Sequence, residues 1–147
     1  MINKVIDKLA WVLIQDGKLL AVRSKGKALF YLPGGKREAG ENDEEALIRE
    51  IKEELSVDLS PTSLKYMETF TAQADGKAEG VSVKLTCYFA DFSGELLPAA
   101  EIEELKFIDG NDEAACSVAA LVALQWLESW KNCLTNASRG IANAWRL

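Results

Sequence analysis

Three glutamates in the first half of the chain, Glu50, Glu53 and Glu54, are spaced so that they could act together. In an α-helix, where successive residues are turned by about 100°, positions i, i+3 and i+4 share one strip of the surface. Carboxylates so placed repel one another, and a bound cation would remove that cost. Hard divalent ions, magnesium above all, take oxygen ligands and keep positions open for water and phosphates. The spacing therefore predicts a metal-binding strip.

A glycine-rich loop, Pro33-Gly34-Gly35, precedes these glutamates. Because glycine has no side chain, the loop backbone can approach a ligand closely, and we expect a carbonyl of this loop to complete the coordination of an ion. Taken alone, an EIKEE run is more often a solvated helix face, and a Pro-Gly-Gly run an ordinary loop. The residues around them decide between the two interpretations.

The composition narrows the chemistry further. The chain contains no histidine, which excludes Ser-His and Cys-His nucleophile pairs and His-ligated metal sites. Its formal net charge of -6 argues against a nucleic acid polymer as partner, because such binding depends on neutralising many phosphates. The G-x4-G-K-[ST] motif of P-loop nucleotide-binding proteins is absent. A small phosphorylated substrate remains compatible if bound cations offset the local negative charge.

The segment from Gly35 to Val57 reads GKREAGENDEEALIREIKEELSV. It resembles the Nudix box, G-x5-E-x7-R-E-U-x-E-E-x-G-U with U apolar, which marks the Nudix hydrolase family. One position departs: Ser56 stands where the family usually has glycine, at a helix end that often needs a positive φ. We expect altered geometry at that end and retained activity. The positions that match are Gly35, Glu41, Arg49, Glu50, Ile51, Glu53, Glu54 and Val57.

The resemblance implies roles for single residues. Mg²⁺, with Mn²⁺ as the alternative ion, would be held by Glu50, Glu53 and Glu54 together with Gly34. Glu50 is also a candidate base and Glu53 is grouped with it as catalytic, while Arg49 would orient the box glutamates. Glu41 would support the metal site. A further acidic residue is expected from Glu101 to Glu104, with Glu104 first.

Basic residues near the box are candidates for phosphate binding. They are Lys36 and Arg37 inside it and Lys25 before it, although Lys25 and Lys27 are more often solvated at such positions.

The expected reaction is attack of water on one phosphorus of a diphosphate linkage, with the ion supplying activation and charge neutralisation. Positions 72–75 read Ala-Gln-Ala-Asp, so neither the proline marker of ADP-ribose hydrolases nor the tyrosine marker of dinucleoside polyphosphate hydrolases is seen. By elimination the prediction favours nucleoside triphosphates, ordinary or oxidised. The alternatives are a nucleotide-sugar hydrolase and a Nudix-fold sensor that binds a nucleotide without cutting it.

The elements that must position this site can be read from periodicity. Asn42 to Leu55 predicts a helix, with Asn42 as cap and Glu45 in the capping-box position. Leu9 to Gln15 and Lys18 to Arg23 predict a hairpin turning at Asp16-Gly17. Leu29 to Leu32 predicts a further short strand before the glycines.

The second half predicts strands over Ser63 to Gln73, Val81 to Phe89 and Glu103 to Ile108, then a helix over Asp112 to Lys131. This order, without regular βαβ alternation, favours an α/β fold of the Nudix type, an α/β/α sandwich with a mixed β-sheet between helices. We expect one domain over residues 1–147, with 132–147 as a poorly defined tail.

Partners and location follow only as defaults. Trp126 and Trp130, four residues apart, are interpreted as core or homodimer-interface residues. Cys87 is interpreted as a core thiol. The apolar run Leu9 to Ile14 is too short for a membrane span or signal peptide, so a cytoplasmic enzyme with no membrane partner is expected.

Overall fold

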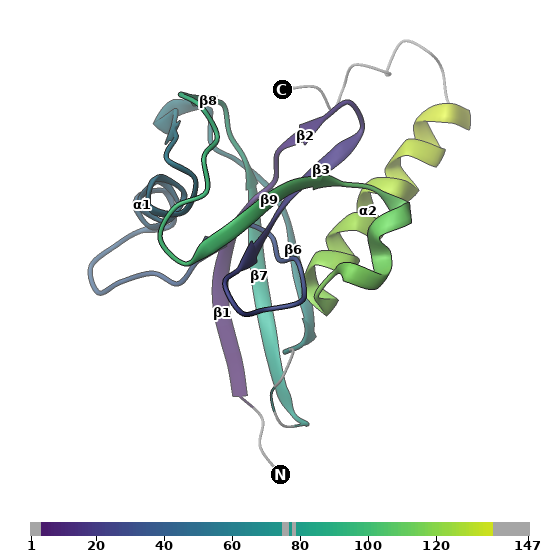
Figure 1. The fold of residues 1–147 in the computed structure, drawn as a ribbon, viewed down its shortest axis with the longest axis horizontal. Helices are drawn as coiled ribbons and strands as arrows, with labels where there is room; N and C mark the ends of the chain where they lie inside the picture. The colour runs from purple at the N-terminus through teal and green to yellow at the C-terminus, as the bar shows by residue number, and fades with distance from the viewer. Residues whose placement is uncertain (1–3, 75–76, 78, 137–147) are drawn as a thin grey trace.

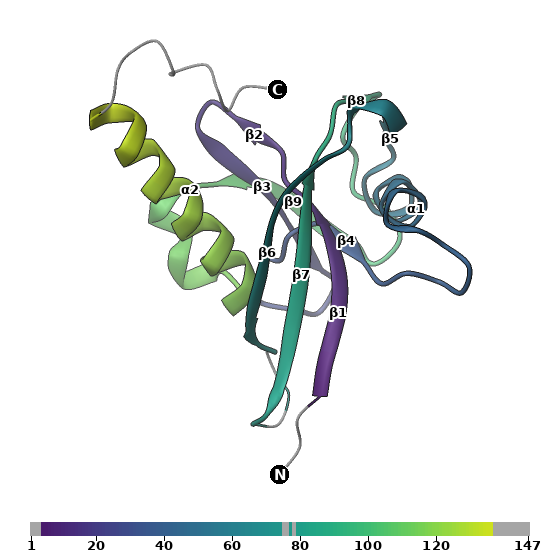
Figure 2. The same cartoon turned by 180° about the vertical axis from the view of Figure 1, so that it is seen from behind.

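The computed structural model describes residues 4–74, 77 and 79–136. Two helices lie on opposite sides of a layer of strands (Figure 1), and the view from behind shows the same arrangement (Figure 2). The α/β/α sandwich with mixed strands is thereby confirmed. No helix in the described part of the chain is both long and apolar enough to cross a bilayer.

The strands of the layer belong to more than one sheet. Among the described residues, a mixed sheet has the order β4-β1-β7-β6, in which β1 runs parallel to β7 and the other pairs are antiparallel. An antiparallel sheet has the order β2-β3-β9, and β5 pairs with β8. The bounds are β1 Lys4–Trp11, β2 Ile14–Gln15, β3 Lys18–Ser24, β4 Gly34–Gly35, β5 Asp58–Leu59, β6 Lys65–Gln73, β7 Val81–Phe89, β8 Phe92–Ser93 and β9 Ile102–Ile108.

The helix that carries the glutamates is α1, Asp43–Leu55. Its predicted capping box is present: the Asn42 side chain accepts from the Glu45 amide at 2.8 Å, and the Glu45 carboxylate accepts from the Asn42 amide at 3.0 Å. At the other end Ser56 takes the left-handed conformation, with φ 66° and ψ 16°. The geometry expected of glycine is therefore retained by a serine, and the expected alteration of this helix end is wrong.

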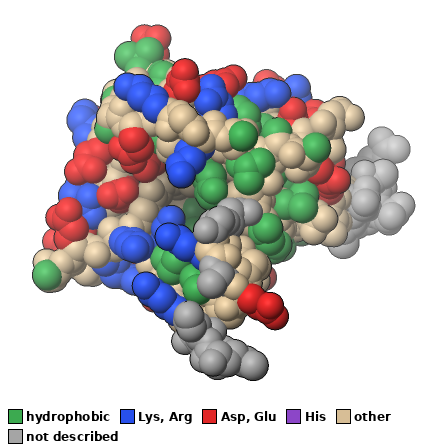
Figure 3. Space-filling view, turned by 60° about the horizontal axis from the view of Figure 1, so that its bottom comes forward, with side chains coloured by type: hydrophobic (Ala, Val, Ile, Leu, Met, Phe, Trp, Pro, Cys, Tyr) green, Lys and Arg blue, Asp and Glu red, His purple; other side chains and the backbone are tan. Residues whose placement is uncertain are grey.

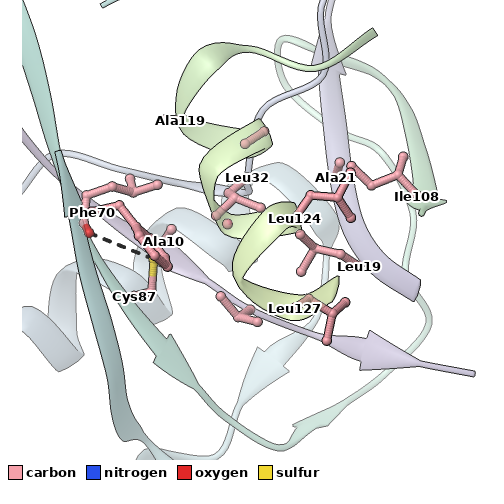
Figure 4. Packing of buried hydrophobic residues seen from close by; sticks show 14 of the residues in the cluster. Ala10, Leu19, Ala21, Leu32, Phe70, Cys87, Ile108, Ala119, Leu124 and Leu127 are labelled. Atoms are coloured by element: carbon pink, nitrogen blue, oxygen red, sulfur yellow. Dashed lines mark hydrogen bonds between the residues drawn. The ribbon is translucent and has the colours of Figure 1, made fainter. Parts of the chain in front are cut away.

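Two hydrophobic clusters hold the helices against the strands. One, shown in Figure 4, lies under helix α2, Val118–Asn136, and includes Leu19, Cys87 and Leu124. The other lies under α1 and includes Trp11, whose ring is fully buried and donates its Nε1 hydrogen to the Ala90 carbonyl at 3.1 Å. Side chains point alternately to the two faces of β1. Ala10 and, just after the strand, Val12 therefore face one cluster, while Leu9 and Trp11 face the other.

Several predicted boundaries differ from the structure. The turn at Asp16-Gly17 is confirmed, with φ 53° and 75°, but the run Leu9 to Gln15 divides between β1 and β2, which lie in different sheets. Leu29 to Leu32 is not a strand: it makes only isolated bridges, from Tyr31 to Val22 and from Phe30 to Cys116. The helix predicted from Asp112 is interrupted, because the 3₁₀ turn Gly110–Ala115 comes before α2.

The remaining strands agree with prediction to within two residues, once the short 3₁₀ turn Pro61–Ser63 is set apart from β6. Cys87 is fully buried, and burial raises the pKa of its thiol to about 12, as expected of a core residue. Trp126 packs against the core and stacks on Trp130, with 6.0 Å between ring centroids. Of the predicted tail, 137–147 lies outside the described residues.

Candidate active site

The acidic strip, defined as Glu50, Glu53 and Glu54, lies along the last turns of α1. Its members differ in exposure. The side chain of Glu53 is 54% exposed, that of Glu50 is 18% exposed, and the residue Glu54 is only 7% exposed. The strip therefore runs from solvent into the protein, because Ile51 and Leu55 on the adjacent face of the helix are fully buried.

Two glycines let this strip reach the strands. Gly34 donates its amide hydrogen to the Glu54 carboxylate at 3.1 Å. A Cβ atom at Gly35 would overlap the Glu50 carboxylate, and one at Gly34 would overlap the Leu9 carbonyl of β1. With φ of 148°, Gly34 also has a backbone conformation that other residues rarely adopt. The absence of a side chain at Gly35 thus leaves room for Glu50, and its absence at Gly34 lets the loop lie close against β1.

Arg49 contacts both the acidic strip and the loop before α1. Its guanidinium binds both oxygens of Glu41, with distances of 2.7 and 2.8 Å, and donates to Glu50 at 2.7 Å. It also donates to the Lys36 carbonyl at 3.2 Å. Such a bidentate pair fixes the orientation of the two side chains as well as the distance between them. The predicted orienting contacts of Arg49 are therefore present, and they tie the loop before α1 to its acidic strip.

The carboxylates of the site differ in the free energy that their ionisation costs. Arg49, followed by the amide of Glu38, holds the pKa of Glu41 down at about 2. Burial raises the pKa of Glu54 to about 8, and the nearby Glu50 and Glu101 add to that rise. Burial likewise raises the pKa of Glu50, although Arg49 opposes the change. Burial thus makes the two inner carboxylates of the acidic strip costly to ionise, a cost that a bound metal ion would lower.

The strip opens into a cleft of about 620 Å³. Its lining combines charged side chains with apolar ones, which include Leu32, Val83, Leu85 and Ala119. Among the described residues, more cationic side chains than carboxylates line it, so its formal charge is positive in a chain of net charge -6. The cations are Lys8, Lys27, Lys36, Arg37, Arg49 and Lys77, and the carboxylates are Glu38, Glu50, Glu54 and Glu101. A phosphorylated molecule with an apolar part matches this combination of charged and apolar side chains.

The description NUDIX domain matches residues 8–130, most of the chain. The chain belongs to the Nudix hydrolase family. Members of this family act on small nucleotide-like substrates and generally use divalent metal ions. The match extends far beyond the box, over α1, β2 to β9, the second half of β1 and most of α2.

Similar proteins include an ADP-ribose pyrophosphatase of Methanocaldococcus jannaschii, 29% identical over 124 residues, which are 82% of this chain and 72% of that protein. The solution structure of the E. coli ORF135 protein is 25% identical with a TM-score of 0.64 and covers 91% of this chain and 93% of that one. The MutT NUDIX hydrolase from Burkholderia pseudomallei is also 25% identical, with a TM-score of 0.66, and covers 84% of this chain and 98% of that one.

The Nudix structure brings most of the predicted site residues together. Glu50, Glu54, Gly34, Arg49, Lys36 and Arg37 all line the cleft. Lys25 does not line it and is exposed, whereas Lys27 does. Arg37 is already engaged by carboxylates, at 2.5 Å from Asp43 and 3.4 Å from Asp7. Within the described residues, no three acidic side chains stand close enough to form a ready-made group of metal ligands.

The later acidic run is arranged differently from the expectation. Glu104 lies opposite Arg23 in the β3–β9 pair and accepts two hydrogen bonds from its guanidinium, at 3.2 and 3.1 Å. Glu101, just before β9, lines the cleft instead, and its charge raises the pKa of both Glu50 and Glu54. The structure therefore favours Glu101 over Glu104 as the fourth carboxylate of the site.

Some residues of the cleft were not singled out from the sequence. Lys8 lies on β1, and Ser117, which is fully buried, accepts from the Ala120 amide at the start of α2. The signal for Lys8 was its place on the same face of β1 as Ala10 and Val12, just ahead of the buried run. No short motif marks Ser117, because only the folded chain brings the residues before α2 to the cleft.

Proposed function

We propose that the chain is a magnesium-dependent Nudix hydrolase that cleaves a diphosphate linkage in a nucleotide-like substrate, with nucleoside triphosphates, ordinary or oxidised, as the first candidates. One observation carries the proposal: the buried Glu54 and the half-buried Glu50, beside Gly34 and Gly35, line a cleft whose described residues carry a positive formal charge overall.

The donor set fits a hard divalent cation. Carboxylate oxygens are the ligands that Mg²⁺ prefers, and burial makes the charges of Glu50 and Glu54 costly without a cation. Glu50, Glu53 and Glu54 would hold the ion, since the exposed Glu53 side chain can turn toward the other two. The bound ion would supply activation of water and relief of negative charge. Mn²⁺, which also takes oxygen ligands, is the alternative.

The chain's own residues would do the rest. Arg49 holds the Glu50 carboxylate in place, so that Glu50 can accept a proton from water at a fixed position. Glu101 lies near enough to influence both inner glutamates and is the second candidate for that proton. The apolar residues of the cleft would exclude water from around the uncharged part of the substrate.

ADP-ribose is a second candidate substrate to be tested. The Methanocaldococcus jannaschii relative is described as an ADP-ribose pyrophosphatase, which favours ADP-ribose although the proline marker is missing from positions 72–75. Nucleotide sugars belong to the same chemical class. The experiment is therefore a panel of nucleoside triphosphates, ADP-ribose and nucleotide sugars, assayed for phosphate or pyrophosphate release with Mg²⁺ and with a chelator.

The matched variants are Glu54→Gln and Glu44→Gln. Glutamine keeps an acceptor for the Gly34 amide but removes the charge, so E54Q should lower turnover by at least about 100-fold, the upper end of the loss seen when a supporting residue of a metal site is changed. Glu44 is exposed on the same helix and E44Q should be neutral. Metal-independent turnover, or full activity of E54Q, would refute the proposal. Binding without turnover across the panel would favour a sensor.

A further inference from the structure

Lysines lie opposite one another where β1 passes the end of β4. Leu9 pairs with Gly35 in the antiparallel register, so Lys8 and Lys36 are opposed one residue further along. Both line the cleft. Like charges placed directly across two strands destabilise the pair. The pKa of Lys8 is lowered accordingly, first by burial and then by the charge of Lys36.

The arginines of the cleft differ from these lysines in being neutralised. Arg37 is held by Asp43 and Asp7, and Arg49 by Glu41 and Glu50. By contrast, within residues 4–74, 77 and 79–136 the ammonium groups of Lys8 and Lys36 have no hydrogen bond or ion pair. Lys36 is exposed but Lys8 is half-buried, and a half-buried charge without a partner is costly. An anion between the two lysines would remove both the burial cost and their mutual repulsion.

The position of the lysine pair suggests which anion this is. Glu50 and Glu54 both raise the pKa of Lys8 by their charge, so the acidic strip and the lysine pair are neighbours in one cleft. Figure 3 shows a face on which Lys and Arg side chains gather beside hydrophobic ones. A diphosphate has two phosphoryl groups, and only one of them needs to lie against an ion on the acidic strip.

We propose that Lys8 and Lys36 form a two-lysine site for the phosphoryl group that the acidic strip does not hold. The identity of the substrate rests on the proposed function, but the binding of a phosphate oxyanion rests on the lysine geometry alone. Lysine suits this task because its ammonium is a compact charge with three donors that can serve different oxygens. Lys8 thereby becomes a substrate-positioning residue on β1, outside the Nudix box.

The test measures binding of inorganic pyrophosphate, with and without Mg²⁺, by isothermal titration calorimetry on the whole chain. The variants are Lys8→Met and Lys36→Met, which keep an unbranched aliphatic side chain. Lys4→Met is the matched control, since Lys4 lies on the same face of β1 but is exposed and outside the cleft. Thermal denaturation of each variant checks that the fold is retained.

We expect K8M and K36M each to weaken pyrophosphate binding by about tenfold or more, as for loss of a hydrogen bond to a charged group. K4M should bind as the unchanged protein does. The chemical shifts of the Lys8 ammonium should also move on titration with pyrophosphate. Undetectable binding by the unchanged protein, binding by K8M that equals it, or an equal loss in K4M would overturn the lysine site.

These outcomes are separable from those of the proposed function. If no substrate of the panel is cleaved but pyrophosphate binding still depends on Lys8, the lysine site stands and the hydrolase proposal fails. If turnover is normal and K8M binds and reacts like the unchanged protein, the hydrolase proposal stands and the lysine site fails.

Discussion

Ser56 ends α1 in a conformation that serine adopts at a cost. Its φ of 66° lies in the left-handed region, where a side chain costs about 1–2 kcal/mol relative to glycine. Part of that cost is offset because its hydroxyl donates to the Leu97 carbonyl at 3.3 Å, a bond worth about 0.5 kcal/mol at an exposed position. The family's usual glycine would avoid the first term and lose the second.

We therefore predict that Ser56→Gly stabilises the protein by about 0.5–1 kcal/mol, which raises Tm by roughly 2–3 °C in a chain of this size. Ser56→Ala is the control, because it loses the hydroxyl but keeps the left-handed strain, and it should be slightly less stable than the unchanged protein. Thermal denaturation compares the three. An S56G variant no more stable than S56A would show that the strain is absent.

Glu54 predicts a dependence of stability on pH. The pKa of Glu54 is about 8 in the folded state against 4.5 as the ordinary value. Between these values the folded state keeps a proton that the unfolded state has lost, so stability falls as pH rises from about 4.5 to 8. Glu54→Gln has no such proton. In a chelator, E54Q should match the unchanged protein near pH 5 and exceed it by a few kcal/mol near pH 8.

Denaturant titrations of both proteins at several pH values, without divalent ions, measure this difference. Glu50 contributes in the same direction in both proteins, so only the difference between them reports on Glu54. A constant difference from pH 5 to pH 8 would mean that the Glu54 carboxylate is ionised throughout.

At the scale of elements, the contact between α1 and β4 depends on two glycines that fail differently when substituted. An alanine at Gly35 meets only the carboxylate end of Glu50, which can turn away. An alanine at Gly34 meets the backbone of β1 at Leu9, in a φ that alanine disfavours. Rigid backbone cannot yield as a side chain can.

We predict that Gly34→Ala destabilises the protein by about 2–3 kcal/mol, whereas Gly35→Ala costs about 1 kcal/mol or less. G35A should nevertheless lower turnover and Mg²⁺ affinity strongly, because it displaces Glu50. Thermal denaturation and Mg²⁺ titration of the two variants, side by side, measure both effects. Equal losses of stability would contradict the idea that β4 leaves room for Glu50.

Elements with local signals could be predicted from the sequence, and those defined by distant partners could not. The capping box of α1 and the Asp16-Gly17 turn are set by residues within one turn of each other. The division of Leu9 to Gln15 between two sheets depends instead on β7, about seventy-five residues away along the chain. Alternation shows which face is buried, but it does not show which strand lies alongside.

The same distinction holds for the site. Glu50, Glu54 and Arg49 could be predicted because the box is contiguous and matches a family pattern. Lys8 lies on β1 and Glu101 lies just before β9, and both line the cleft although they are far from the box in the sequence. The sequence does not show the β3–β9 register, which places Glu104 opposite Arg23, and so it gives no ground for setting Glu101 before Glu104.

In the whole molecule, the formal charge of the cleft lining has the opposite sign to the net charge of the chain. The chain has a net charge of -6, yet among the described residues more cations than carboxylates line the cleft. An anionic substrate would be repelled at long range and attracted only near the cleft. Ionic strength screens the long-range part more than the short-range part. Moderate salt is therefore expected to affect substrate binding less here than in a basic protein.

Metal binding should be visible as stability of the whole fold. An ion that binds the folded state alone stabilises it by about 2.7 kcal/mol at a concentration 100 times its Kd, or roughly 5–10 °C in Tm for a chain of this length. Because the ion needs Glu54 ionised, while burial holds the pKa of Glu54 at about 8, binding releases a proton and strengthens with pH. The increase in Tm caused by Mg²⁺ should therefore be larger at pH 8 than at pH 6.

Thermal denaturation with and without Mg²⁺ at both pH values tests this linkage, and E54Q and E44Q separate its causes. E44Q alters an exposed carboxylate on α1 and should keep the full effect. E54Q removes the group that titrates, so its increase in Tm should be small and nearly independent of pH. If Mg²⁺ raised the Tm of E54Q as much as that of the unchanged protein, the ion would be bound somewhere other than the acidic strip. Catalysis in the cleft would then not depend on an ion held by that strip.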